Sequence, residues 1–122
     1  LKLGIDLKRQ KNTNGLTVEV FQNVTTNDEH VLLDLREDSE IYHDGKIKNS
    51  IHVPFDQVSD YLIKEKENLK GKKILMYCAV GHRSTLEVQV SKSYDYKNCY
   101  HLMGGVKNWV AQGNPIEKKD HH

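Results

Sequence analysis

The chain has 122 residues, of which 37% are hydrophobic and 29% charged, and its formal net charge is +1. That length suits one domain with a single core. No apolar run approaches the ~20 residues that span a bilayer, so we expect a soluble protein with no membrane partner, in the cytoplasm or periplasm. Basic residues alternate with acidic ones and form no stripe with aromatics between them. Nucleic acid is therefore not an expected partner.

The N-terminal stretch is compatible with two structures. LKLGIDL (1–7) and LTVEV (16–20) alternate with period two on either side of Asn14-Gly15, a typical hairpin turn. Alternatively, Thr17 caps a short helix, VEVFQNV (18–24). In that helix the inward residues would be Val20, Phe21 and Val24.

The rest of the chain alternates short apolar runs with helical patterns. VLLDL (31–35) and KILMY (73–77), continuous apolar runs rich in branched residues, predict strands buried on both faces. IHV (51–53) and CYHL (99–102) predict further short strands. Helical spacing predicts one helix over 55–69 capped by Asp56, one with Leu86, Val90 and Tyr94 at i+4 spacing, and VKNWVAQG (106–113). This alternation predicts an α/β fold whose parallel sheet is covered by helices on both faces.

The segment CAVGHRS (78–84) follows the strand KILMY directly. Cys78 therefore lies at the carboxyl end of a parallel strand, where ligands of open sheets bind. Amides of the loop and of the first helical turn have no intrahelical acceptors, so they can converge on an anion. Gly81 lets the loop curl inward, and Arg83 adds a fixed fork of donors that suits oxyanions. These residues predict an activated sulfur nucleophile in an anion cradle.

Each of these residues also has a simpler interpretation. Cys78 could be an inert buried thiol, and Arg83 a solvated surface arginine. We expect His82 to be an exposed loop residue, with substrate contact as the alternative, and Cys99 to be a packing residue. The two cysteines form no C-x-x-C, and the seven histidines show no metal-ligand spacing. Neither a disulfide scaffold nor a metal site is expected.

Four ordered motifs resemble those of single-domain rhodaneses, a family of sulfurtransferases. CAVGHRS matches the family's C-x-x-G-x-R-S loop, and LLDLRE (32–37) resembles L-D-V-R-E. EIYHDGKIKNSIHVP (40–54) is similar to E-(F/Y)-x-x-G-H-I-x-G-A-x-N-I-P, and NCYHLMGGVKNW (98–109) to N-V-Y-x-L-x-G-G-x-x-x-W. The resemblance implies a rhodanese-like α/β fold, with a parallel five-stranded sheet flanked by helices on both faces. We divide the chain into an N-terminal extension or edge hairpin (1–15), a rhodanese-like domain (16–116) and a tail (117–122) whose terminal histidines are typical of a tag remnant.

The resemblance also implies a reaction. Sulfane sulfur would pass from thiosulfate or a related donor, through a Cys78 persulfide, to cyanide or a thiol, with no metal or organic cofactor. A protein sulfur acceptor is a further candidate partner. Asp34 and Arg36, which could otherwise be a surface charge pair, would be structural supports. The predicted site comprises Cys78 as the catalytic residue and Ala79, Val80, Gly81, His82 and Arg83 as substrate-binding residues.

Other functions of related architecture stay open. Protein phosphatases and arsenate reductases use C-x5-R, whereas here the arginine comes at C-x4-R, and the tighter loop fits a sulfur atom better than a phosphoryl group. A non-catalytic recognition module of the same fold would be marked by loss of the cysteine, which is present. A subunit that only relays persulfide to a partner is not separated from a free enzyme by the sequence.

The chain departs from the family pattern at several positions. Lys46 occupies the place of the His in G-H-I, and Ser50 and His52 replace the common Ala and Asn. We expect these changes to affect substrate preference rather than the chemistry. Glu87 and Ser91 stand where small or apolar residues are usual, which predicts a looser or more exposed helix after the cysteine loop.

Overall fold

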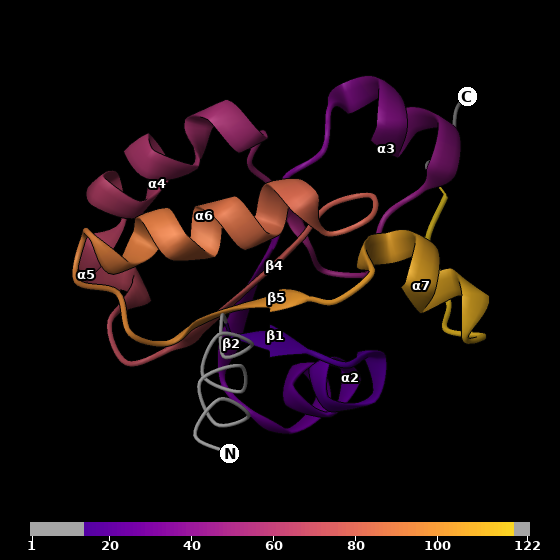
Figure 1. Cartoon of the computed structure of the whole chain (residues 1–122), viewed down its shortest axis with the longest axis horizontal. Coiled ribbons are helices and arrows are strands. Elements are labelled where there is room, and N and C mark those ends of the chain that lie inside the picture. The colour runs from indigo at the N-terminus through magenta and orange to yellow at the C-terminus, as the bar shows by residue number, and fades with distance from the viewer. Residues whose placement is uncertain (1–13, 119–122) are drawn as a thin grey trace, which may run out of the picture.

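The computed structural model describes residues 14–118, which form one sheet with helices on both faces (Figure 1). The sheet order is β1-β5-β4-β2-β3, and every neighbouring pair is parallel. This confirms the predicted α/β class with a parallel five-stranded sheet. The strands are β1 (Gly15–Leu16), β2 (His30–Asp34), β3 (Ile51–His52), β4 (Lys73–Tyr77) and β5 (Cys99–Leu102).

Two layers of helices cover the sheet. Helices α2 (Val18–Asn27) and α7 (Gly105–Ala111) pack on one face, and η1 (Phe55–Gln57), α4 (Val58–Lys64), α5 (Lys66–Leu69) and α6 (His82–Lys92) on the other (Figure 1). Successive residues of β4 alternate between the two cores, so its continuous apolar run is buried throughout. Between residues 14 and 118, no helix is both long and apolar enough to cross a bilayer.

Of the two interpretations of residues 16–24, the structure has the helix. The Thr17 side chain accepts a hydrogen bond from the Val20 amide at 3.2 Å and caps α2. Leu16 pairs with Leu102 of β5 in parallel rather than within a hairpin. Phe21 faces the core as expected, but the prediction for Val20 is wrong, because its side chain is exposed. The alternative hairpin's first strand lies outside the described residues, and the domain limits at residues 15 and 117 stay predictions.

Helix α3 (Asp38–Asp44) was not expected from the sequence. None of its residues is buried, so no apolar periodicity marks it. It begins after Glu37, whose amide donates to the Glu40 carboxylate at 2.8 Å. The helix expected over 55–69 is instead divided into η1, α4 and α5, and Asp56 does not cap it, because η1 begins after Pro54.

Helix α6 buries a different face from the one that its apolar spacing indicates. Leu86 and Val90 are exposed, whereas Glu87 and Ser91 are buried against the core with Val88. The expectation that Glu87 and Ser91 loosen this helix is therefore wrong. Ser91 is small and satisfies its hydroxyl by donating to the Val88 carbonyl at 2.7 Å, so the helix can pack closely on the sheet. Glu87 has no such partner, and its Oε1 is buried without a hydrogen bond.

Candidate active site

The cysteine loop lies at the carboxyl end of β4, the central strand of the sheet. Cys78 follows β4 directly and is only 1% exposed. Its Sγ accepts from the amides of Gly81 at 3.2 Å and Ser84 at 3.4 Å, and lies 3.5 Å from the Ser84 hydroxyl. Gly81 adopts a φ of 107°, which turns the chain from the loop into α6. The loop therefore aims two backbone amides at one sulfur atom, whose thiol donates to the Ser84 hydroxyl.

Two carbonyl groups of the same loop point away from the Cys78 sulfur, toward α7. The Cys78 carbonyl accepts from the Val106 amide at 2.9 Å, and the Ala79 carbonyl accepts from the Lys107 amide at 3.1 Å. These contacts satisfy two first-turn amides of α7 that have no intrahelical acceptor. Gly105 allows the approach: a Cβ there would lie 2.3 Å from the Ala79 carbonyl oxygen. With its carbonyls held outward, the loop keeps its amides directed at Cys78.

Arg83 closes the loop by pairing with α3. Its two terminal nitrogens donate to the two oxygens of Glu40 at 2.9 Å each. These hydrogen bonds hold the pKa of Glu40 below its ordinary value and raise the pKa of Arg83, so both groups stay charged near neutral pH. The guanidinium predicted to meet an anionic donor is thus already engaged by a carboxylate. Sequence reasoning missed Glu40, although it stands in the quoted motif EIYHDGKIKNSIHVP.

Asp34 and Arg36 form a buried ion pair beside the loop rather than a surface pair. The Asp34 carboxylate accepts from the Arg36 amide and Nε at 3.0 Å each, from its Nη2 at 2.8 Å, and from the Tyr77 hydroxyl at 2.6 Å. Arg36 also donates to the Gly45 carbonyl at 2.6 Å, just after α3. Burial and the Asp34 charge raise the pKa of Tyr77 far above its ordinary value. This network ties the ends of β2 and β4 to the segment that carries α3.

The remaining predicted residues are placed as follows. Val80 and His82 are exposed, and Ala79 is half-buried. Cys99 is buried and pairs with Ile74 of β4. Because Ile74 precedes Cys78 by four residues, the two cysteines are separated by about 13 Å along the strand direction. Burial raises the pKa of Cys99 to about 11. The second thiol therefore lies outside the cradle.

Several contributors to the site were not singled out from the sequence. They are Glu40, Tyr77, Ser84 and Gly105. Ser50, noted only as a departure from the family pattern, accepts from the Tyr77 hydroxyl at 3.2 Å. Ser84 and the double glycine stand inside the quoted motifs, but nothing in the local sequence shows that Tyr77 would meet Asp34. Within residues 14–118, no cluster of three or more His, Cys, Asp or Glu side chains could hold a metal ion.

A cysteine at the carboxyl end of a central parallel strand, with its sulfur held by two loop amides, defines the class: an α/β protein with a cysteine loop. Comparison with known proteins specifies the class further: the model of the rhodanese-like domain matches residues 17–112, and the chain belongs to this family. It is therefore a member of the sulfurtransferase superfamily.

Curated relatives differ in what their names describe. The chain is 28% identical over 116 residues to thiosulfate sulfurtransferase/rhodanese-like domain-containing protein 3 of Mus musculus, covering 87% of this chain and 74% of that protein. It is 30% identical over 125 residues to the tRNA uridine(34) hydroxylase of Rickettsia conorii, covering 89% of this chain and 50% of that protein. The chain thus spans half the length of this hydroxylase.

Solved structures support the same fold. A protein of unknown function from Rhodopseudomonas palustris, described as a possible tyrosine phosphatase, matches with a TM-score of 0.78 at 26% identity, covering 90% of this chain and 89% of that one. A rhodanese-like domain protein from Staphylococcus aureus matches with a TM-score of 0.71 at 24% identity, covering 88% and 99% of the two chains.

Proposed function

We propose that this chain transfers sulfane sulfur through a persulfide on Cys78. The observation that carries the proposal is the convergence of the Gly81 and Ser84 amides on one buried sulfur atom. Such pre-oriented donors stabilise an anionic sulfur without reorganising during the reaction. Membership of the rhodanese-like family supports the same chemistry.

The proposed reaction is a double displacement. The Cys78 thiolate attacks the outer sulfur of thiosulfate, a new S–S bond forms, and sulfite leaves with the electron pair of the broken S–S bond. An acceptor, cyanide or a thiolate, then attacks the outer sulfur of the persulfide, and Cys78 leaves as thiolate. No net redox change occurs in the enzyme. Thiosulfate is the donor that we propose, with a thiol or cyanide as acceptor and a protein thiol as a further candidate.

The proposed roles of the neighbours follow from their contacts. Loop amides hold the persulfide, with those of Gly81 and Ser84 contacting the sulfur of Cys78 itself. Arg83 acts through Glu40, which fixes the loop against α3, in addition to any contact with the donor. Asp34 and Arg36 stabilise the end of β4, from which the loop begins, and contact no reacting atom.

Intact-mass measurement after exposure to thiosulfate tests the proposal. We expect an added mass of one sulfur atom that cyanide removes. Cys78→Ser should show no adduct, because a hydroxyl cannot form the persulfide, whereas the matched variant Cys99→Ser should show it. An unmodified wild-type mass, or an adduct that persists in Cys78→Ser, would refute the assignment.

A phosphatase is a second candidate because the Rhodopseudomonas palustris structure carries that description. The geometry favours sulfur transfer, since the loop is one residue shorter than C-x5-R and Arg83 is paired with Glu40. Hydrolysis of an aryl phosphate that depends on Cys78, without a sulfur adduct, would favour the phosphatase. Similarity to the tRNA uridine(34) hydroxylases supports a third candidate, a domain that acts on tRNA, and tRNA binding by this chain in a gel-shift assay would test it.

A further inference from the structure

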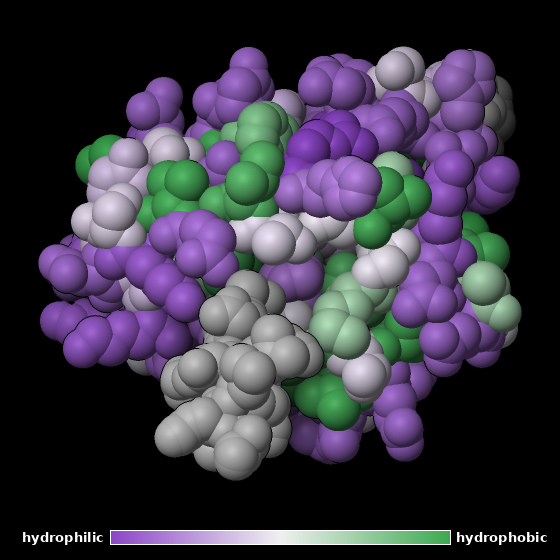
Figure 2. Space-filling model, in the orientation of Figure 1, coloured by the Kyte–Doolittle hydropathy of each residue, from purple (hydrophilic) through white to green (hydrophobic). Residues whose placement is uncertain are grey.

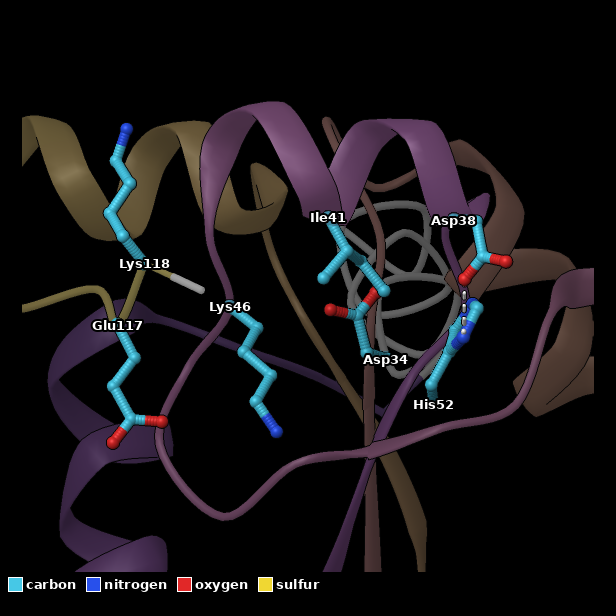
Figure 3. Close-up of a pocket in the computed structure, with 7 residues that line it drawn as sticks. All are labelled: Asp34, Asp38, Ile41, Lys46, His52, Glu117 and Lys118. Atoms are coloured by element: carbon cyan, nitrogen blue, oxygen red, sulfur yellow. Dashed lines mark ion pairs between the residues drawn. The ribbon is translucent and has the colours of Figure 1, made fainter. Parts of the chain in front are cut away.

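A cavity of about 320 Å³ lies away from the cysteine loop, between α3, the segment 46–52 and residues 117–118 (Figure 3). No residue of the segment 78–84 lines it. Its volume is at the lower end of the range for ligand pockets, so it suits a small molecule. Because it belongs to neither the cradle nor the Arg83 pair, sulfur transfer leaves it without a role.

One wall of the cavity is fixed by backbone contacts. Lys46 and Glu117 form an antiparallel bridge, with the Lys46 amide donating to the Glu117 carbonyl at 2.9 Å and the Glu117 amide donating to the Lys46 carbonyl at 2.7 Å. Gly45, at a φ of +85°, allows this close contact, since a Cβ there would lie 2.7 Å from the Glu117 carbonyl oxygen. The wall is therefore formed before any ligand arrives.

Residues directly opposite in an antiparallel bridge project their side chains to the same side. Figure 3 shows the side chains of Lys46 and Glu117 extending in the same direction from this bridge. No ion pair joins them, and among the described residues Lys46 Nζ has one hydrogen bond, 3.4 Å long, to the Ser50 carbonyl. An ammonium has three donors. Within residues 14–118, the bridge thus presents a cation with open donors beside a carboxylate that has no side-chain partner.

The buried carboxylate of the cavity, Asp34, is already occupied, whereas Asp38 is 96% exposed at the rim. Asp34 accepts four hydrogen bonds and is neutralised by Arg36. Asp38 faces His52 Nδ1 at 3.4 Å, while His52 Nε2 donates to the Arg36 carbonyl at 2.6 Å. Apart from Asp38 and Lys118 at the rim, the opposite charges available to a ligand are those of the bridge. Ile41 adds an apolar wall (Figure 3).

Two of the lining residues are ones at which this chain departs from the rhodanese pattern. Lys46 stands where the family has the His of G-H-I, and His52 where Asn is common. The ammonium of Lys46 therefore belongs to this chain rather than to the general rhodanese pattern. That placement indicates a ligand preference separate from the sulfur chemistry.

We propose that this cavity binds a small zwitterion of the α-amino acid class. Its carboxylate meets the Lys46 ammonium, its ammonium meets the Glu117 carboxylate, and a short apolar side chain lies against Ile41. A ligand with both charges matches the bridge better than a simple anion, which the carboxylates at the rim would repel.

Titration of the isotope-labelled full chain with L-alanine, followed by amide chemical shifts, tests the proposal. We expect saturable shifts confined to residues 38–52 and 116–118, and at least roughly tenfold weaker binding of acetate and of ethylamine, each of which keeps one of the two charges and so loses ~1.4 kcal/mol. Shifts that do not saturate up to the solubility limit of alanine, or equal binding of acetate, would overturn the proposal.

Variants locate the site. Lys46→Met and Glu117→Gln should each remove saturable binding while leaving the other amide signals unchanged, because the bridge uses only backbone atoms. Lys118→Gln is the matched control: it removes the same charge from the rim, but Lys118 Nζ lies 3.5 Å from the His43 carbonyl, and binding should persist. Cys78→Ser should bind alanine as the wild type does, so loss of sulfur transfer and loss of this site are distinguishable. Wild-type binding by both Lys46→Met and Glu117→Gln would overturn the proposal even if alanine binds elsewhere.

Discussion

The ion pair between Arg83 and Glu40 allows a quantitative test of how the cysteine loop is held. Two parallel hydrogen bonds of 2.9 Å join the groups, whose side chains are 28% and 29% exposed. A buried charged pair of this geometry would contribute ~1.5–3 kcal/mol, but solvent screens half-exposed charges. We therefore expect a coupling energy of about 1 kcal/mol between the two side chains.

A double-mutant cycle measures that coupling. Glu40→Gln, Arg83→Met and the double variant would be unfolded in urea at neutral pH, and the three losses of unfolding free energy compared. We expect the double variant to lose about 1 kcal/mol less than the sum of the single losses. Additive losses, within ~0.3 kcal/mol, would refute the view that this pair holds the loop.

The pH dependence has a defined sign. Because Arg83 lowers the pKa of Glu40, the pair's contribution is complete above the ordinary carboxyl pKa and is lost as the pH falls through the lowered one. Coupling measured in increasingly acidic buffer should therefore decline, and a coupling that strengthens on acidification contradicts the assignment.

Kinetics separate two roles of Arg83. If Arg83 acts by holding the loop through Glu40, Glu40→Gln and Arg83→Met should slow persulfide formation from thiosulfate by similar factors, roughly tenfold for a loss of ~1.4 kcal/mol. If Arg83 instead binds the donor, Glu40→Gln releases the guanidinium and should leave the rate unchanged or raise it. Stopped-flow measurement of the first half-reaction decides between them.

Three further predictions concern other residues. Glu87→Met should raise the unfolding free energy at neutral pH by about 1–2 kcal/mol, because it removes a buried carboxylate oxygen without a partner. Burial raises the pKa of Glu87, so the wild-type protein loses stability as the pH rises through that pKa. In thermal unfolding, the stability difference between Glu87→Met and the wild type should therefore become smaller in acid. A difference that grows in acid contradicts this. Gly105→Ala should slow persulfide formation at least roughly tenfold, because its Cβ would displace the Ala79 carbonyl. Gly113→Ala is the control, since Gly113 has a φ of +86° but no atoms near the position of a Cβ, and it should keep the activity. Equal loss of activity in both variants would point to backbone strain alone. Cys99→Ala should keep near-normal turnover at a cost of ~1 kcal/mol in urea unfolding, and collapse of turnover in a folded variant would show that Cys99 takes part.

The fold was predictable where the signal is local and apolar. KILMY matches β4 and VLLDL overlaps β2 because strands buried on both faces leave continuous apolar runs. Helix α3 was missed because it buries no side chain, and the face of α6 was misassigned because its buried positions include Ser84, Glu87 and Ser91. Apolar periodicity detects neither case.

The residues of the site likewise fall into those with a local sequence signal, which were predicted, and those without one, which were missed. Cys78 and Gly81 were identified because strand, glycine turn and helix start follow one another within a few residues. Glu40 and Tyr77 were not, since each meets its partner, Arg83 or Asp34, across 43 residues of chain. Pairings at that separation are set by sheet order and helix packing, which the local pattern does not encode.

Because α7 binds two carbonyls of the cysteine loop, the conformation of the loop depends on two segments that are distant in the sequence. The first turn of α7, beginning at Gly105, holds the Cys78 and Ala79 carbonyls. A fragment ending after β5 would keep Cys78, Gly81 and Arg83 but lose the α7 amides that bind the two carbonyls and orient the loop. The protein could thus be divided between β5 and α7 into two segments, and we expect the shorter C-terminal segment to restore the arrangement of amides around Cys78 when it is added back. Grafting CAVGHRS alone onto another scaffold would not transfer the chemistry.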